Sequence, residues 1–345
     1  MKSLKEQLGK AKDLLLSSAR PFFLFDDDPD GLASFLLLYK MVHAGKGMAL
    51  KGAVVDERMA EKVNAYQPDL VVFLDKAEVA QEFFDEVKTP CIWIDHHEPK
   101  KRNGNITYVN PRSFNAQDNQ PTSLLCYQIT EEDAWIAAVG IVADWQMPPK
   151  NILDICEKEY PGFIDTTITN PPEALFTNPV GELARMFSFN LKGRMSEVLA
   201  SMKILTRIKN PNELLKKEHS QAKFVMKKYE QRLSEYVELR SKVEIDESSP
   251  LIVFVYDEAK NSYTTDLSNE LLFKFPDKMI IIARKSGESY KCSLRSSTMR
   301  VDMFLKQVLE LVGGSGGGHE HACGAVIPED SWEEFLKALR KEVKG

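Results

Sequence analysis

Hydrophobic and polar positions in the first hundred residues repeat in an order typical of alternating strands and helices. Short apolar runs, which indicate buried strands, lie at 21–25, 50–55, 70–74 and 91–94. Apolar residues at helical spacing lie at 3–18, 32–43, 58–66 and 79–87. This alternation predicts a doubly wound parallel sheet in an α/β domain.

The pattern changes further along the chain. Helices are predicted at 124–129 and 131–143, and a long region of helical period follows at 191–242. Later strands are predicted at 251–255, 279–283 and 289–297, with helices at 301–311 and 332–343. We therefore predict an N-terminal α/β domain over 1–190, a helical linker over 191–245 and a smaller C-terminal α/β domain over 246–345.

Acidic and imidazole side chains follow the carboxyl ends of the N-terminal strands. Asp28 and Asp30 follow the first strand, Asp75 follows the third, and Asp95-His96-His97 follows the fourth. In a parallel sheet these ends share one edge, where ligands bind. So many carboxylates and imidazoles in one place would repel each other without a cation. The sequence therefore predicts a metal site, to which Asp144, at the end of a predicted helix, would add a ligand.

Each of these features has a simpler interpretation when it is taken alone. The run 26–31 is rich in turn residues, Asp75 suits a helix cap, and Asp144 suits a helix end. Their matching places in a repeated pattern favour the metal site. Oxygen ligands with one or two imidazoles suit Mn²⁺ or Mg²⁺ better than zinc. Two such ions, about 3.5–4 Å apart, can clamp a phosphoryl group.

A glycine run in the C-terminal part is the second candidate site. Gly316-Gly317-Gly318 precede His319, and no Gly-Lys-Ser/Thr follows, so the run is not a Walker A loop. A flexible linker is one interpretation. The other is a loop whose backbone N–H groups cradle a phosphate, with His319 touching it and Arg295 holding it bidentately.

Composition limits the class of protein. The 345 residues are 43% apolar and 28% charged, without a run of about 18 apolar residues that could span a membrane. From the first twenty residues we expect no signal peptide. We expect a cytoplasmic protein. Five scattered cysteines form no C-x-x-C pair, which indicates reduced thiols. The net charge of −6 argues against a surface that grips long nucleic acid everywhere. The segment 191–232 has eleven Lys/Arg against four Asp/Glu, which fits a solvated helix face or a basic wall of a substrate channel.

Taken together and in this order, the motifs resemble the DHH–DHHA1 family of phosphoesterases, which includes RecJ-type exonucleases, oligonucleotide and cyclic-dinucleotide phosphodiesterases, and polyphosphatases. The resemblance rests on Asp26-x-Asp28-x-Asp30-Gly31, Asp75, Asp95-His96-His97, Asp144, Ser293-x-Arg295-Ser296 and Gly316-Gly317-Gly318-His319. The sequence departs from the family pattern at Lys76-Ala77, Trp145 and Cys323, although none of these departures removes a ligand.

The resemblance implies two bound Mn²⁺ ions, with Mg²⁺ as the alternative, and a role for each motif. The implied ligands are Asp26, Asp28, Asp30, Asp75, His96 and Asp144, with Asp75 bridging. His97 would contact the scissile phosphate or support the metals, and Asp95 would orient the histidines. Across an interdomain cleft, the phosphate of the terminal nucleotide would be held by Arg295, Ser296, Gly316, Gly317, Gly318 and His319.

We therefore expect a RecJ-like exonuclease that releases mononucleotides from the ends of single-stranded DNA or RNA. The alternative is a phosphodiesterase or phosphatase for short oligonucleotides, cyclic dinucleotides or phosphoadenosine phosphate. A non-catalytic scaffold is the third interpretation. The sequence leaves open a protein partner from the replication or repair machinery and a homodimer.

Overall fold

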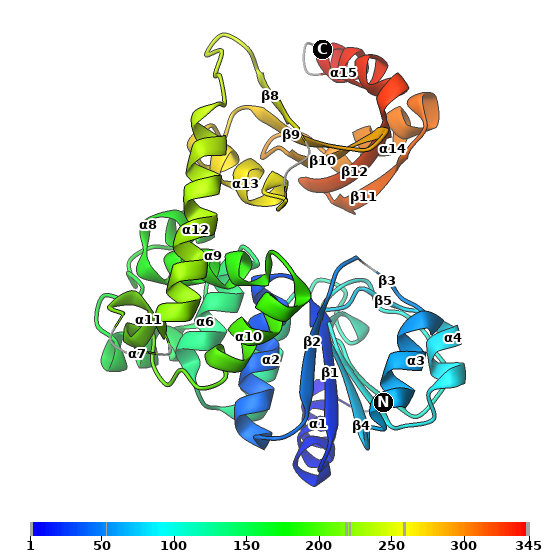
Figure 1. Cartoon of the computed structure of the whole chain (residues 1–345), viewed down its shortest axis with the longest axis vertical. Helices are drawn as coiled ribbons and strands as arrows, with labels where there is room; N and C mark the ends of the chain where they lie inside the picture. The colour runs from blue at the N-terminus through cyan, green and yellow to red at the C-terminus, as the bar shows by residue number, and fades with distance from the viewer. Residues whose placement is uncertain (1–2, 53, 218–219, 221, 258–259, 343–345) are drawn as a thin grey trace. The chain divides into compact units, whose positions relative to one another are not determined.

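The structure is a computed structural model that describes residues 3–52, 54–217, 220, 222–257 and 260–342 (Figure 1). The chain divides into two compact units, residues 1–230 and 231–345. Helix α12 (Ala222–Ser241) contains the division between them. Helices α10 (Met195–Leu205) and α11 (Asn212–Leu215) precede α12 in the linker predicted over 191–245.

The first unit contains the predicted parallel sheet. Its five strands lie in the order β2, β1, β4, β6, β7, and every neighbouring pair is parallel. They are β1 (Pro21–Asp26), β2 (Lys46–Leu50), β4 (Leu70–Leu74), β6 (Cys91–Ile94) and β7 (Ile106–Val109). Helices α3 (Glu57–Tyr66) and α4 (Gln81–Glu86) lie on the opposite side of the sheet from α2 (Pro29–Val42) (Figure 1). The doubly wound α/β fold is thereby confirmed.

Aromatic side chains fill the core on both faces of this sheet. On one face the Phe73 ring meets Phe83 of α4 edge-on, with ring centroids 5.1 Å apart. On the other face Phe25 stacks on Phe35 of α2 at 4.8 Å. These strands are buried on both faces, which explains why they are continuous apolar runs rather than alternating ones.

The strand register aligns the ends of the central strands. Phe25 lies opposite Leu74, Leu74 opposite Ile94, and Ile94 opposite Val109. The next residues along these strands are therefore neighbours at one edge, and they are Asp26, Asp75, Asp95 and Asn110. The strand order reverses between β1 and β4, and such a switch point is where α/β sheets bind ligands.

The strand predicted at 50–55 and the start of the helix predicted from residue 131 differ from the structure. The strand predicted at 50–55 is wrong, because β2 ends at Leu50 and Gly52 adopts a left-handed φ of 89° that interrupts the run. The following β3 (Val54–Val55) pairs instead with β5 (Glu78–Val79) in a separate small sheet. The helix predicted from residue 131 begins at Ala134, because Glu131 and Asp133 have positive φ angles.

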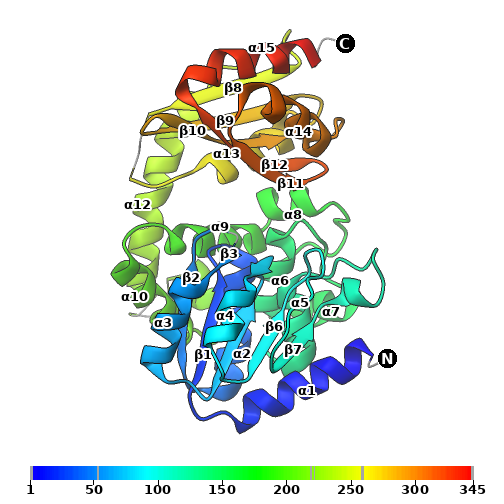
Figure 2. The ribbon, with the colours of Figure 1, turned by 90° about the vertical axis from the view of Figure 1, so that its right-hand side faces the viewer.

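The remaining helices of the first unit lie around this sheet. Helix α1 (Leu4–Ser17) lies beside β7 (Figure 2). The others are η1 (Pro111–Ser113), α5 (Thr122–Thr130), α6 (Ala134–Ala143), α7 (Lys150–Glu159), α8 (Pro171–Thr177) and α9 (Pro179–Leu191). No helix among the described residues is long and apolar enough to cross a membrane.

The second unit is a smaller α/β domain, as predicted. Its sheet has the order β11, β12, β10, β9, β8, with only the β8–β9 pair parallel. The strands are β8 (Leu251–Tyr256), β9 (Met279–Ser286), β10 (Ser289–Arg295), β11 (Ser315–His319) and β12 (Ala322–Pro328). The helical elements are α13 (Thr264–Lys274), α14 (Val301–Val312), η2 (Glu329–Ser331) and α15 (Trp332–Glu342).

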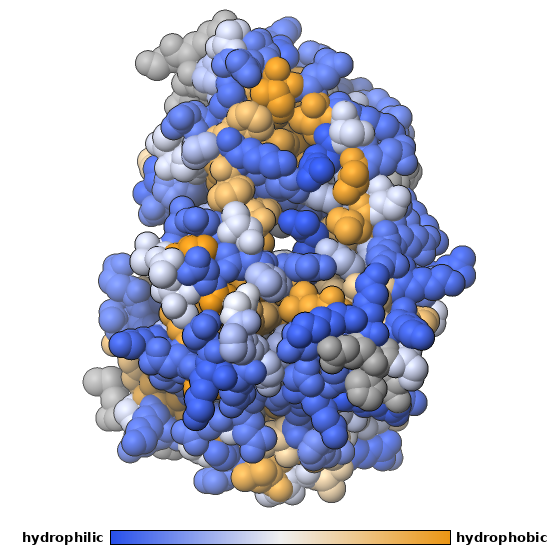
Figure 3. Space-filling view, turned by 90° about the vertical axis from the view of Figure 1, so that its left-hand side faces the viewer, coloured by the Kyte–Doolittle hydropathy of each residue, from blue (hydrophilic) through white to orange (hydrophobic). Residues whose placement is uncertain are grey.

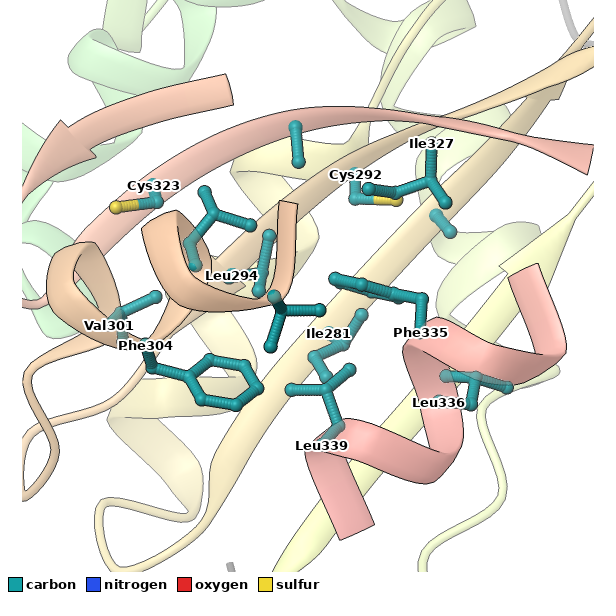
Figure 4. Close-up of a cluster of buried hydrophobic side chains, with 14 of the residues drawn as sticks. Ile281, Cys292, Leu294, Val301, Phe304, Cys323, Ile327, Phe335, Leu336 and Leu339 are labelled. Atoms are coloured by element: carbon teal, nitrogen blue, oxygen red, sulfur yellow. The ribbon is translucent and has the colours of Figure 1, made fainter. Parts of the chain in front are cut away.

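The core of the second unit lies between its sheet and two helices. Side chains of α14 and α15, such as Phe304 and Phe335, pack on Ile281, Leu294 and Ile327 of the strands (Figure 4). The face of the chain drawn in Figure 3 is mostly hydrophilic, with hydrophobic residues scattered over it. Scattered exposed hydrophobic residues are normal for a folded surface.

The glycine run forms a strand rather than the predicted loop. Residues 315–319 make up β11, the exposed edge strand that pairs with β12. A Cβ at Gly318 would lie 2.3 Å from the Ala322 carbonyl oxygen, so this close pairing requires glycine there. The sequence pattern failed because glycine lacks strand propensity, and the pairing with β12 outweighs that preference.

Candidate metal site

The first two acids of the site lie where β1 leads into α2. Asp26 is the last residue of β1, and Asp28 caps α2 by accepting a 2.8 Å hydrogen bond from the Gly31 N–H. A Cβ at Gly31 would lie 2.5 Å from the Asp26 carbonyl oxygen. Only glycine therefore allows the helix to begin so close to the strand end, which places Asp26, Asp28 and Asp30 together.

Asp30, in the first turn of α2, is buried against the start of helix α5. Its two carboxylate oxygens accept hydrogen bonds from the backbone N–H groups of Thr122, at 2.9 Å, and Ser123, at 3.0 Å. The N-terminus of a helix favours a negative charge, because its first N–H groups have no partner within the helix. This contact holds α5 against the metal-site edge of the sheet.

Asp75 connects the carboxylates to the histidines. It follows β4 with a left-handed φ of 57°, a conformation that Asp adopts more readily than most residues. Its Oδ1 accepts a 3.1 Å hydrogen bond from the Thr122 hydroxyl and lies 3.4 Å from Nε2 of His96. Its backbone N–H donates to the Ile94 carbonyl, which keeps Asp75 level with the end of β6.

His96 is the central imidazole of the site. Its side chain is 5% exposed, and Nδ1 lies 3.7 Å from Oδ2 of Asp144, the C-cap residue of α6. Among the described residues, this buried nitrogen has no hydrogen-bond partner. Ligand atoms of Asp75, His96 and His97 all lie within 4.8 Å of one another. Carboxylate oxygens, together with an imidazole nitrogen that is not used in a hydrogen bond, are ligands that a hard divalent cation binds. These residues therefore fit such an ion.

His97 is oriented by residues beneath it. Its Nδ1 lies 2.7 Å from Oδ1 of Asp95, which is fully buried. The other Asp95 oxygen accepts from the His97 N–H and from Nδ2 of Asn110, which follows β7. Asp95 therefore fixes the ring of His97, while its role in catalysis stays a prediction.

The carboxylates of this site are electrostatically crowded. Burial raises the pKa of Asp144 to about 8 and the pKa of Asp26 and Asp30 to about 6. Burial and neighbouring acids also raise the pKa of Asp28. Burial would raise the pKa of Asp75 too, but its hydrogen bond and attraction to His96 lower it to about 2. The cluster thus holds more negative charge than its own cations balance, and a bound cation would relieve this repulsion.

Three residues to which the sequence analysis gave no role belong to this site. Thr122 binds Asp75, Asn110 binds Asp95, and Nζ of Lys76 lies 2.5 Å from Oδ1 of Asp26. Asn110 could have been found, because it is the polar residue after a predicted strand, as the acids are. Nothing local to Lys76 indicates its burial, because its partner lies fifty residues earlier in the chain.

The predicted phosphate-binding residues lie in the second unit. Arg295 donates from Nε to Asn269, and from Nη1 to the Leu294 and Cys323 carbonyls. Ser296 is fully buried and accepts from the backbone N–H groups of Thr298 and Met299. Gly316, Gly317, Gly318 and His319 lie on the exposed edge strand β11. Their binding of phosphate, and their action together with the first unit, stay predictions.

Sequence models of two known families match this chain. The sequence model described as "DHH family, N-terminal domain" matches residues 22–157, and the one described as "DHHA1 domain" matches residues 248–345. The chain is a DHH family protein with a DHHA1 domain. The DHH match covers every candidate ligand of the metal site. No curated protein sequence matches the chain.

Solved structures share the fold of this DHH protein at low sequence identity. RecJ of Thermus thermophilus in complex with Mn²⁺ is 17% identical, with a TM-score of 0.68 over 100% of this chain and 55% of that chain. The chain thus spans about half the length of that RecJ. An exonuclease RecJ bound to manganese is 19% identical, with a TM-score of 0.61 over 100% and 95%. The pGpG-specific phosphodiesterase PggH of Vibrio cholerae is 13% identical, with a TM-score of 0.50 over 94% and 99%.

Proposed function

We propose that this DHH protein is a divalent-metal-dependent phosphodiesterase, and that it releases mononucleotides from the ends of single-stranded DNA or RNA. One observation carries the chemistry: the buried Nδ1 of His96, which has no hydrogen-bond partner in the described part of the chain, lies among carboxylates at the edge of the sheet that holds the switch point. We propose Mn²⁺ as the ion, with Mg²⁺ as the alternative, because the similar RecJ structures hold one or the other. A bound divalent ion supplies Lewis-acid stabilisation of the charge on a phosphoryl group.

The residues of the chain would divide the work as follows. Asp28, Asp75, His96 and Asp144 would hold metal through oxygen and imidazole donors. His97 would donate a hydrogen bond from Nε2 to a phosphate oxygen, because Asp95 already binds its Nδ1. Burial opposes the charged ring, but the hydrogen bond to Asp95 outweighs it and raises the pKa of His97, which favours the doubly protonated ring that donates from both nitrogens.

The bare backbone of β11 supports substrate binding by the second unit. A Cβ at Gly317 would meet no other atom within 4 Å, and its φ does not require glycine. The fold therefore gives no reason for the missing side chain at this position. A ligand that approaches the backbone closely would give one, and we assign that ligand as the phosphate of a terminal nucleotide.

A second candidate function is hydrolysis of short oligonucleotides, cyclic dinucleotides or phosphoadenosine phosphate. The basic segment 191–232, one interpretation of which was a basic wall of a substrate channel, is partly used inside the protein. Lys228 is buried and donates to the Asn190 carbonyl, and the buried Arg232 pairs with Glu235. Neither side chain belongs to a solvent-facing basic wall, which favours a smaller substrate.

Substrate length separates these functions. We would incubate the full chain with Mn²⁺ and end-labelled single strands from two nucleotides to several tens, in DNA and in RNA. The proposed exonuclease shortens long strands one nucleotide at a time. Activity restricted to the shortest strands would support the second candidate. Bound metal without hydrolysis of any strand or small phosphoester would contradict both and leave the scaffold interpretation.

A further inference from the structure

A buried lysine lies beside the metal site. Lys76 directly follows Asp75, and its side chain is 1% exposed. Its ammonium nitrogen lies 2.5 Å from Oδ1 of Asp26 and 2.5 Å from the carbonyl oxygen of Gly52. Its own carbonyl accepts a 2.8 Å hydrogen bond from Nε1 of Trp93. Hydrogen bonds therefore hold both the backbone carbonyl and the ammonium group of Lys76, and the ammonium group is buried away from solvent.

This ammonium changes what Asp26 can do. Two positive charges on one carboxylate repel each other, and burial makes that repulsion stronger than it would be in water. A lysine ammonium is a compact point charge, comparable in this respect to a metal ion. Asp26 already has its cation, so a divalent ion gains little from binding to it.

A second acid of the expected ligand set is also compensated. Both oxygens of Asp30 accept backbone N–H groups at the start of α5. The donors that remain for an ion are Asp28, which accepts one backbone N–H, Asp144, and the pair of Asp75 with His96. Nε2 of His96 lies 3.4 Å from Asp75, and Nδ1, on the other side of the ring, lies 3.7 Å from Asp144. With Asp26 and Asp30 already compensated, the remaining donors are three carboxylates and one imidazole. Three carboxylates, one imidazole and water match the six ligands of a single Mn²⁺ or Mg²⁺.

We propose that the Lys76 ammonium occupies the place of one of the two expected ions, and that this chain binds a single divalent ion tightly. The inference rests on the proposed metal-dependent function and specifies its metal content. Asp75 is then a ligand of one ion and not a bridge between two. The lysine keeps a positive charge next to Asp26 whatever the concentration of metal in the solution.

The number of bound ions tests the inference without any measurement of activity. The full chain is stripped with chelator, desalted and titrated with Mn²⁺ in a calorimeter, and the bound manganese is counted by elemental analysis after a second desalting. The wild type should bind one ion per chain. Lys76→Gln, which removes the charge and leaves Asp26 unpaired, should bind two.

Lys40 provides a matched control. It is a largely buried lysine in the same unit that also bonds one aspartate, Asp133, and one carbonyl, that of Ile208, at 2.7 Å and 2.9 Å. Lys40→Gln should bind one ion, like the wild type. Asp26→Asn in the wild-type background should also bind one ion with unchanged affinity, because Asp26 is not a ligand in this arrangement.

Each result decides between one ion and two. Two ions of similar affinity in the wild type, or one ion in Lys76→Gln, would overturn the inference. If Lys76→Gln does not fold, the wild type and Asp26→Asn still decide, because a two-ion site loses an ion when Asp26 is changed. One bound ion without hydrolysis would contradict the proposed function alone, whereas two bound ions with hydrolysis would contradict only the inference.

Discussion

Thr122 and Thr130 begin and end helix α5 and allow one hydroxyl of the metal site to be tested against an internal control. The Thr122 hydroxyl donates to buried Asp75 at 3.1 Å, whereas the buried Thr130 hydroxyl has no hydrogen-bond partner among the described residues. Valine preserves the shape and the β-branch at both positions. The two substitutions therefore differ mainly in the hydrogen bond that each removes.

The magnitudes follow from these contacts. A hydrogen bond to a charged group contributes about 1.5–3 kcal/mol, so Thr122→Val should lower the free energy of unfolding by that amount. Thr130→Val removes a hydroxyl that is buried without a partner, so it should leave stability unchanged or raise it by about 1 kcal/mol. Residues that support a metal ligand typically contribute about 10- to 100-fold to metal affinity, and Thr122→Val should weaken Mn²⁺ binding by that factor.

Two assays measure these effects on the same samples. Urea unfolding followed by circular dichroism gives the stability without metal, and calorimetric titration gives the Mn²⁺ dissociation constant. Thr130→Val should bind Mn²⁺ as the wild type does. Equal stability and equal Mn²⁺ affinity of the two variants would refute the role of Thr122 in positioning Asp75.

Three further predictions concern the site itself. Asp75→Ala should reduce phosphodiester hydrolysis at least about 1,000-fold in a steady-state assay, and unchanged turnover would exclude Asp75 as a ligand. The pKa of Asp144, raised from 3.8 to about 8 by burial, means that its proton must leave when metal binds. Calorimetric Mn²⁺ affinity should rise about tenfold per pH unit from pH 6 to 8, and metal-free stability should fall as pH rises through this range; a flat affinity profile would contradict this. Asp95→Asn should lower the pKa of His97, followed by NMR, toward its ordinary 6.5, and no shift would contradict the contact.

The sheet and the acids at its edge could be predicted from the sequence for a physical reason. Strands buried on both faces are continuous apolar runs, and parallel strands bring their carboxyl ends to one edge. Asp75 and His96 therefore follow from their positions alone. Their exact partners do not, because the hydroxyl that binds Asp75 belongs to Thr122, a residue far away in the chain.

Other features depend on tertiary contacts that no local pattern contains. Lys76 resembles a solvated turn residue in the sequence, and only its pairing with Asp26 and Gly52 reveals a buried cation. The glycine run resembles a loop until β12 pairs with it. Gly52 divides what appears in the sequence as one strand, because its left-handed backbone is possible for glycine in any context.

Hydrolysis of a simple phosphodiester tests the central claim most directly, because it requires no knowledge of the natural substrate. The chelator-stripped full chain would be assayed on bis(p-nitrophenyl) phosphate, with and without Mn²⁺, beside Asp75→Ala and Lys40→Gln. The account predicts hydrolysis that appears with Mn²⁺, disappears with chelator, persists in Lys40→Gln and is absent from Asp75→Ala. Hydrolysis without metal, or equal rates in the wild type and Asp75→Ala, would contradict it.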